Sequence, residues 1–537
     1  MLLPLVLLSI VTAVSTHDQL VFNLPLDAAE YRSPGQLPRP RVAIIGGGAA
    51  GTSSAYFLGF LGTQEPSLAC DIDLFESNDY LGGRSTTVQP FDSYDESLTS
   101  IELGGSIFVK VNKNIWKAVD TFNLTLQEGH GGGSDYLNEM GIWDGEHFVY
   151  RENPHSDNDK KMGRRYGRSP VTAGNAVQNT VSSFINLYSK EFQSKGPHEG
   201  IREYMEGLGL GGLTGTTTLE YLKSLGVRDL FIKEVVAATT RVNYGQDPSH
   251  LHAFEGIVSM ATFGASSVKG GNRQIFQEFG KRSGATIYLG TKVETIRKTD
   301  DMSLESAYSS GCPWLVRYRD LSSGIVTTRA YDAIIHASPI HPQLPLNTTG
   351  IAFSNSDIPN RIPVQPYVHL HVTILVTNAT SPRPEFFGLQ GKVPNTILST
   401  FEANKGRTKP TFNSLVYLQS LGKLDDERGV EHIVKIFSED EMTDSMLAAM
   451  FGATEVLWTH RKSWAAYPTS PPILETESLP SFKPDTSATF YYPAAFERRV
   501  STMETETVSA WNSVSLLVRD LFGYNVKTSW AEWDAGE

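Results

Sequence analysis

The stretch RVAIIGGGAAG, from Arg41 to Gly51, decides the fold of this chain. Its first five residues are rich in β-branched and apolar side chains and predict a short strand that is buried on both faces. Gly46, Gly48 and Gly51 follow in the G-x-G-x-x-G spacing. Glycine at these places allows a tight turn, lets a pyrophosphate approach the backbone, and lets a following helix pack close to the strand. The stretch predicts a dinucleotide site, and a glycine turn without a ligand is the alternative.

A helix is expected directly after the glycines, over about residues 49–61. Its first residues, Ala49 and Ala50, would present free N–H groups and the positive end of the helix dipole to the phosphates. A second strand, Asp71 to Phe75, is followed by Glu76, whose carboxylate can accept from both hydroxyls of an adenosine ribose. This order favours NAD or FAD over a 2′-phosphorylated dinucleotide.

The composition is that of a globular protein with an excess of acid. The chain has 537 residues, 40% of them hydrophobic, a net charge of −13 and a pI near 5.5. That length allows two or three domains, or one large two-lobed enzyme. Polyanion binding needs clustered Lys and Arg, and no such cluster dominates the chain. The charge balance therefore argues against binding to nucleic acid or to an anionic membrane.

The N-terminal segment predicts entry into the secretory pathway. Residues 1–14, MLLPLVLLSIVTAV, form an apolar run too short to span a bilayer comfortably, and small and polar residues follow. Residues 1–16 therefore resemble a signal peptide, with an uncleaved anchor as the alternative. We expect a lysosomal, vacuolar or extracellular protein without a transmembrane segment, for which peripheral membrane contact stays open. Three glycosylation sequons, at Asn123, Asn347 and Asn378, are consistent with passage through the secretory pathway.

Neither the cysteines nor the histidines predict a metal site. Cys70 and Cys312 are the only cysteines, too few for a disulfide scaffold. One bridge between them and two buried free thiols are the alternatives, and free thiols are favoured. His369 and His371 share one face of a predicted strand, but no third ligand lies at a telling spacing. They are expected to pack, or to form a polar wall of the substrate pocket.

Two later glycine pairs suggest further contacts with the cofactor. In YLGGRSTTV, Gly83 allows a close backbone approach, and Arg84 is expected to contact the pyrophosphate or flavin side of the cofactor. In IELGGSIFV, Gly104 and Gly105 suggest that the backbone passes a large, flat group. Val293 lies in a predicted strand whose backbone can pair with an adenine edge.

The C-terminal helix is the last predicted cofactor element. It begins at Met503 with Ser501 or Thr502 as its N-cap, and Glu504 and Glu506 suit its positive first turn. Its N–H groups can stabilise the negative charge that collects at N1 and O2 of a flavin that accepts a hydride. A helix that merely packs at the end of the chain is the alternative.

The expected fold class is α/β, with a Rossmann-like FAD-binding domain interleaved with an α+β substrate domain. A nucleotide-binding sheet that is interrupted by a helical insertion and completed later is typical of FAD-dependent oxidases, whereas plain NAD dehydrogenases rarely need it. The expected divisions are a signal peptide (1–16), a lead-in (17–39), a first FAD-binding part (40–110), a helical substrate lobe (111–240), a second FAD-binding part (241–340), a substrate-domain sheet (341–485), and a C-terminal strand and helix (486–530).

Eight segments are particular enough to suggest a family. They are VAIIGGGAAGTSSAYFL, FES followed by LGGRSTTV, IELGGSIF, RVNYGQ, VKGGN, YDAIIHASP, WAAYP and YYPAAFERRVSTMETETV. Together they resemble the prenylcysteine oxidases, also called prenylcysteine lyases, over about residues 40–520. The resemblance implies a domain of the amine-oxidase/glutathione-reductase type. It also implies oxidative cleavage of the thioether in farnesyl- or geranylgeranyl-cysteine, with oxygen and water, to cysteine, a prenyl aldehyde and hydrogen peroxide.

The patterns and the resemblance together assign residues to noncovalently bound FAD. These residues are Gly46, Gly48, Ala49, Ala50, Gly51, Glu76, Gly83, Arg84, Gly104, Gly105, Val293, Met503, Glu504 and Thr505. Lys269 is the catalytic candidate, placed near flavin N5 through a water, and a surface lysine is the alternative. Other functions stay open: an FAD-dependent amine oxidase or biosynthetic oxidoreductase on another hydrophobic substrate, a non-catalytic lipid-binding glycoprotein, and an NAD dehydrogenase.

Overall fold

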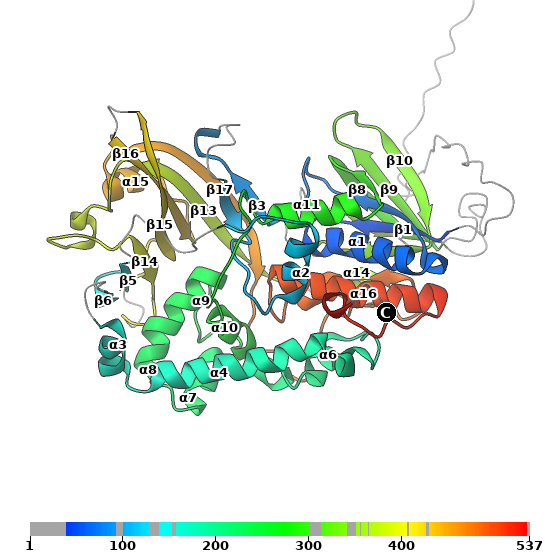
Figure 1. Ribbon diagram of the computed structural model, residues 1–537, viewed down its shortest axis with the longest axis horizontal. Helices are drawn as coiled ribbons and strands as arrows, with labels where there is room; N and C mark the ends of the chain where they lie inside the picture. The colour runs from blue at the N-terminus through cyan, green and yellow to red at the C-terminus, as the bar shows by residue number, and fades with distance from the viewer. Residues whose placement is uncertain are drawn as a thin grey trace, which may run out of the picture. The chain divides into compact units, whose positions relative to one another are not determined.

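The predicted first strand, β1 (Arg41–Ile45), lies at the centre of a five-stranded parallel sheet in the computed structural model (Figure 1). The structure describes residues 39–92, 100–127, 139–152, 157–299, 313–340, 351–354, 356–363, 365–404, 408–425 and 429–533. The sheet order is β18-β11-β1-β2-β7, with β2 (Asp71–Phe75), β7 (Thr286–Tyr288), β11 (Ala333–His336) and β18 (Phe490–Tyr491). Because these strands come from three distant parts of the chain, the prediction of an interleaved Rossmann-like sheet is confirmed.

Helices α1 (Ala49–Gln64), α11 (Arg273–Arg282) and α16 (Met503–Phe522) pack together beside this sheet (Figure 1). Phe57 of α1 is at the centre of their contact, with ring centroids 5.7 Å from Phe279 and 5.2 Å from Trp511. Both contacts are edge-to-face, the arrangement that aromatic quadrupoles favour. The Trp511 side of α16 therefore faces α1, and α16 is buried all round from Glu504 to Val518.

Two smaller sheets extend the nucleotide-binding region. One is a ribbon of β3 (Thr86–Val88) and β4 (Ile101–Gly104). The other has the order β10-β9-β8-β12, with β8 (Thr291–Lys298), β9 (Trp314–Asp320), β10 (Val326–Tyr331) and β12 (Ala352–Ser354). Alternating side chains over 285–297 predict a pair of neighbouring strands, but the structure divides them. β7 joins the central sheet, and β8 joins the meander that it forms with β9 and β10.

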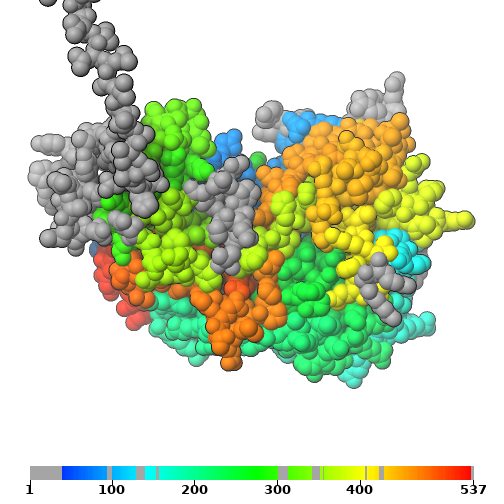
Figure 2. Space-filling view, turned by 180° about the vertical axis from the view of Figure 1, so that it is seen from behind, coloured from blue at the N-terminus to red at the C-terminus, as the bar shows by residue number. Residues whose placement is uncertain are grey.

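The second large sheet has seven strands in the order β17-β13-β16-β15-β14-β5-β6. Its members are β5 (Met140–Trp143), β6 (Phe148–Arg151), β13 (Tyr367–Thr377), β14 (Thr396–Ser399), β15 (Ser414–Asp425), β16 (Gly429–Ser438) and β17 (Val456–Pro468). All neighbours are antiparallel except β14 and β5. Viewed from behind, β17 (orange) and the meander strands (green) stand on either side of a notch in the surface (Figure 2).

The remaining helices come mainly from the insertion between the two nucleotide-binding parts. They are α2 (Lys113–Thr121), α3 (Asn158–Tyr166), α4 (Ser169–Phe184), α5 (Lys190–Gln193), α6 (Ile201–Gly207), α7 (Thr218–Ser224), α8 (Asp229–Phe231), α9 (Ala237–Tyr244), α10 (Ala253–Ser259), α14 (Ile358–Arg361) and α15 (Asp444–Phe451). None of the helices in the described ranges has both the length and the hydropathy to cross a bilayer.

Several local expectations need correction. Helical spacing over 219–240 predicts one helix, but the structure divides this stretch into α7 and the helical run that begins with α8, because the chain turns at Gly226, where φ is +83°. The prolines from Ser463 to Pro493 predict a connector, but the first part of this stretch, WAAYP, forms the end of β17. The hairpin β5–β6 comes from the expected helical lobe yet joins the seven-stranded sheet. The domain boundaries themselves stay a prediction.

Candidate active site

The glycine turn after β1 has the geometry that a dinucleotide needs. Gly46 has a φ of +103°, and its N–H donates to the Phe75 carbonyl at 2.8 Å. A Cβ on Gly51 would lie 1.7 Å from the Gly46 carbonyl oxygen. Only glycine therefore lets α1 begin this close to β1, with its N-terminus at the turn.

Glu76 lies at the end of β2, where a ribose-binding acid is expected. One of its carboxylate oxygens accepts from the Gly47 N–H at 2.7 Å. The other accepts from the backbone N–H and the side-chain amide of Asn78, at 2.7 and 2.6 Å. A carboxylate oxygen has two lone pairs, so the oxygen bound by Asn78 is fully used, and the oxygen bound by Gly47 keeps one lone pair for a ribose hydroxyl.

A single cavity of about 1000 Å³ connects the glycine turn to the start of α16. Of the residues predicted to hold the cofactor, twelve line it: Gly46, Gly48, Ala49, Ala50, Glu76, Gly83, Arg84, Gly104, Gly105, Val293, Met503 and Thr505. Gly104 lies at its wall against Trp464 of β17, since a Cβ there would lie 2.8 Å from the indole ring. The turn, the ribose acid and the flat glycine wall fit FAD in an extended conformation.

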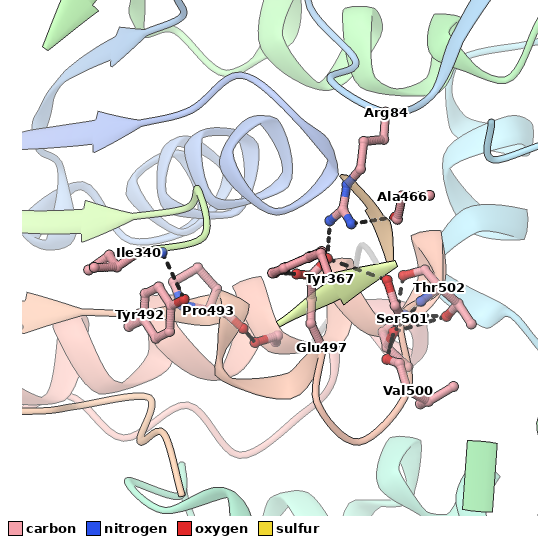
Figure 3. A network of polar contacts seen from close by, with 12 residues as sticks. Arg84, Ile340, Tyr367, Ala466, Tyr492, Pro493, Glu497, Val500, Ser501 and Thr502 are labelled. Carbon is pink, nitrogen blue, oxygen red and sulfur yellow. Dashed lines mark hydrogen bonds and ion pairs between the residues drawn. The ribbon is translucent and has the colours of Figure 1, made fainter. Parts of the chain in front are cut away.

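Arg84 is held by two segments that are distant in sequence (Figure 3). Its guanidinium donates to the Ala466 carbonyl at 2.8 Å and forms an ion pair with buried Glu497. The Tyr367 hydroxyl donates to the other carboxylate oxygen of Glu497. These contacts tie the substrate sheet to the segment before α16 and fix Arg84 at the cavity wall.

The N-terminus of α16 opens onto the same cavity. Thr502, one of the two predicted N-caps, accepts from the Thr505 N–H at 3.0 Å, and the Thr505 hydroxyl accepts from the Thr502 N–H at 3.0 Å. Met503 packs beside Gly105, where a Cβ would lie 3.1 Å from the methionine sulfur. Glu506 also lines the cavity, and burial raises the pKa of its carboxyl to about 7 against the opposing charge of Arg84.

Glu504 does not face the cavity. Its two carboxylate oxygens accept from the N–H groups of Asn114 and Ile115, each at 2.9 Å, and the Tyr188 hydroxyl donates to it as well. Its carboxylate instead caps the first turn of α2, so any contribution of Glu504 to cofactor binding would come from its backbone. Gly51 is likewise absent from the cavity wall and acts through the packing of α1.

Lys269 is exposed and outside the cavity, so the structure does not support its predicted place near the flavin. Three lysines line the cavity, Lys292, Lys435 and Lys462. The buried one is Lys435 of β16, which was not predicted from the sequence. Its ammonium donates to the Glu102 carbonyl at 2.6 Å and to the Ser106 hydroxyl at 3.0 Å. Burial lowers its pKa to about 8, while the Glu102 carboxylate acts in the opposite direction. The one available signal was a lysine inside the apolar run HIVKIF.

The Glu102 carboxylate acts on this lysine through its charge, while the hydrogen bond between the two residues is made by the Glu102 carbonyl. One oxygen of the Glu102 carboxylate accepts from the Asn272 N–H at 2.5 Å. Burial raises its pKa to about 7, and Lys435 opposes that shift. The hydrogen bonds of Lys435 to the Glu102 carbonyl and to Ser106, and that of Asn272 to the Glu102 carboxylate, therefore hold the segment that contains Gly104 and Gly105.

The rest of the cavity is lined largely by apolar side chains. They come from the loop after β4, from α4, α9 and α10, and from the seven-stranded sheet: Ile107, Phe108, Val109, Val181, Phe184, Val242, Val258, Leu370, Val416, Leu418, Phe437 and Trp464. The residues predicted to bind FAD, which form the cofactor wall, and these apolar side chains, which form the apolar wall, therefore line one continuous cavity.

The other predicted residues are placed as follows. His369 is exposed at the cavity wall beside the Ser463 hydroxyl, whereas His371 is outside the cavity. No group of three metal-binding side chains occurs among the described residues. Cys70 is a free thiol, and burial raises its pKa to about 12.

Three predicted features fall outside the ranges that the structure describes. Cys312, Asn347 and the predicted signal peptide all lie outside those ranges. Of the remaining sequon residues, Asn123 is exposed and Asn378 is half-buried.

Comparisons with known proteins agree with this geometry. Residues 153–529 match the prenylcysteine lyase family, and residues 44–122 match an NAD(P)-binding Rossmann-like domain. Farnesylcysteine lyase of Arabidopsis thaliana is 28% identical over 502 residues, covering 89% of this chain and 88% of that protein. Prenylcysteine oxidase 1 of Homo sapiens is 28% identical over 513 residues, covering 91% and 90%.

Two solved structures share the fold. A putrescine oxidase double mutant has a TM-score of 0.51 at 12% identity, covering 91% of this chain and all of that one. Cyclohexylamine oxidase from Brevibacterium oxydans IH-35A also has a TM-score of 0.51, at 14% identity, covering 90% of this chain and all of that one. At such identities the likeness shows the fold alone, and the family rests on the match over most of the sequence. The chain therefore belongs to the prenylcysteine lyase family of FAD-dependent oxidoreductases.

Proposed function

We propose that this protein cleaves farnesyl- or geranylgeranyl-cysteine oxidatively. The thioether, oxygen and water give free cysteine, the prenyl aldehyde and hydrogen peroxide. Relatives named farnesylcysteine lyase and prenylcysteine oxidase 1 match along about nine-tenths of the chain and support this substrate class.

One structural observation carries the proposal: the apolar wall and the cofactor wall enclose the same cavity. Its volume of about 1000 Å³ is at the upper end for small-molecule sites, as a dinucleotide with a lipid chain beside it requires. Burying an isoprenoid against this wall would contribute about 25 cal/mol for each Å² of apolar surface removed from water. A small hydrophilic substrate would gain nothing from such a wall.

The residues of this chain position the substrate and shape the cavity around it. FAD held along the glycine turn would provide a hydride acceptor for the carbon next to sulfur. Trp464 and the Gly104–Gly105 wall confine the reacting part of the substrate, and the apolar side chains exclude bulk water from the prenyl tail. Lys435 and Ser106 place polar hydrogen-bonding groups at the same wall. Because an allylic C–H next to sulfur is already activated, positioning contributes more here than a strong base.

The test uses the purified, FAD-loaded protein. With farnesylcysteine in air, we expect farnesal and hydrogen peroxide in equal amounts, and without oxygen we expect the flavin absorbance to bleach. An S-alkylcysteine of similar length but without the allylic double bond is the matched control and should react far more slowly. Turnover of putrescine or cyclohexylamine instead would indicate an amine oxidase. A flavin that bleaches with none of these compounds would indicate a lipid carrier and contradict the proposal.

We also propose that the protein enters the secretory pathway and is a glycoprotein of the lysosome, vacuole or extracellular space. The apolar N-terminal run and the exposed position of Asn123 support this address. Expressed in a eukaryotic cell, the protein should migrate faster after endoglycosidase treatment, and Asn123→Gln should remove part of that shift. A protein that keeps residues 1–16 and carries no glycan would contradict it.

A further inference from the structure

Two chain segments meet at one rim of the cavity. The N–H of Phe108 donates to the Ser266 carbonyl at 2.9 Å, and the N–H of Ser266 donates to the Phe108 carbonyl at 2.8 Å. We call residues 105–110 and 261–269 the rim loops. They are polar or small at most positions, yet Ile107 lines the cavity and is still 37% exposed.

Phe263 is the most exposed large apolar side chain of the described residues. Its relative exposure is 99%, although Ala261 and Thr262, the two residues before it, line the cavity. Nothing in the fold requires an aromatic ring there, since its ring contacts none of the core. An exposed ring beside the entrance of an apolar cavity indicates contact with another apolar phase.

The charge of this region is opposite to that of the whole chain. The segments 103–119 and 256–275 contain no Asp or Glu, in a sequence with 59 acids against 46 bases. Within them, Lys113 forms an ion pair with Glu532, and Lys117 donates to backbone carbonyls. Lys110 and Lys269 are exposed, and neither takes part in an ion pair between described residues. The net charge of −13, which argued against anionic membranes, therefore does not describe this surface.

We propose that the rim loops dock the protein on an anionic phospholipid membrane, with Phe263 inserted among the acyl chains. This inference rests on the proposed function, because a prenylated substrate partitions into lipid. The lysines meet the phosphate headgroups while the ring enters the apolar layer, the two interactions that peripheral membrane binding combines. Docking at the rim would let the substrate pass from the bilayer to the apolar wall without crossing water.

The experiment measures co-sedimentation of the FAD-loaded protein with vesicles of phosphatidylcholine, with and without phosphatidylserine. We expect binding to the anionic vesicles that weakens with salt. Phe263→Ser and Lys110→Glu should each reduce it by about tenfold. The matched controls are Leu474→Ser, an apolar residue 67% exposed elsewhere, and Lys527→Glu, another exposed lysine; neither should change binding.

Enzyme kinetics distinguish the docking proposal from the proposed catalytic function on which it rests. With farnesylcysteine delivered in vesicles, Phe263→Ser should raise KM several-fold, and with dissolved substrate it should leave kcat and KM unchanged. Vesicle binding without any turnover would support docking and contradict the proposed function. Equal vesicle binding by the wild type and Phe263→Ser, or a change of oligomeric state in that variant, would overturn the docking proposal.

Discussion

Gly51 tolerates a side chain less than any other residue of the glycine turn. We predict that Gly51→Ala forces α1 away from β1, because a Cβ there would lie 1.7 Å from a backbone oxygen that cannot move independently. The variant should lose flavin absorbance and about 3 kcal/mol or more of stability. Both are measured on purified protein by the visible spectrum and by denaturant unfolding.

Gly174→Ala is the matched control at the residue scale. Gly174 is exposed within α4, and no atom lies within 4 Å of the position of an added Cβ. That substitution should stabilise the protein by about 0.5–1 kcal/mol and leave flavin binding intact. Retained flavin in Gly51→Ala would contradict the role assigned to the turn.

Lys435 offers a second prediction at this scale. Lys435→Met removes the cation beside buried Glu102 and the two hydrogen bonds that brace the Gly104–Gly105 wall. We expect a loss of about 3 kcal/mol in the free energy of unfolding, as for other broken buried pairs. Adding Glu102→Gln should recover part of the loss, since the uncompensated charge is then gone. A double variant no more stable than Lys435→Met would argue that the pair is not coupled.

At the scale of elements, one helix caps another. The Asn112 side chain makes no capping hydrogen bond at the start of α2, and Glu504 of α16 instead accepts from two N–H groups of its first turn. Glu504→Ala should therefore cost about 2–3 kcal/mol. Hydrogen exchange at the Asn114 and Ile115 amides should accelerate with it. Glu191→Ala, an exposed acid on α5, should change stability by less than about 0.5 kcal/mol.

The same helices show what the sequence could predict. The β1–α1–β2 unit and α16 were predicted correctly because their signals are local: a buried strand, spaced glycines, a threonine cap and an apolar helical face. Seven of the twelve predicted residues that line the cavity lie in these elements or directly beside them: Gly46, Gly48, Ala49, Ala50, Glu76, Met503 and Thr505. The hydrogen-bond partners of the Glu504 side chain could not be predicted, because they lie on α2, about 390 residues away in the chain.

Lys435 and the end of β17 were missed for a related reason. A lysine in a strand is usually solvated, and only the approach of the β4 segment buries this one. WAAYP contains a proline and precedes a proline-rich stretch, which favours a connector. Its pairing with β13 depends on a strand nearly a hundred residues earlier.

On the scale of the whole molecule, buried acids make stability depend on pH. Burial raises the carboxyl pKa of Glu102, Glu504 and Glu506 to about 7 and that of Glu255 to about 8. The folded state then holds protons that the unfolded state has released, so this contribution to stability is lost as the pH rises from about 4.5 to 8.

Buried His252 and His336 affect stability in the opposite direction, because their contribution decreases as the pH falls. Burial lowers their pKa to about 3 and about 4, so their contribution is lost as the pH falls below about 6.5. We predict that Tm is higher at pH 6.5 than at pH 8, measured by calorimetry on protein without added flavin. Glu255→Gln should reduce this difference, and a Tm that rises between pH 6.5 and pH 8 would contradict the assignment.

The interleaved order of the central sheet has a consequence for biosynthesis. The glycine turn leaves the ribosome well before β18 and α16, which complete the sheet and the far wall of the cavity. A nascent chain must keep its half-built sheet from aggregating until those two segments emerge. We therefore expect flavin capture to follow their emergence, and a chain that stops at the end of β17 to be colourless.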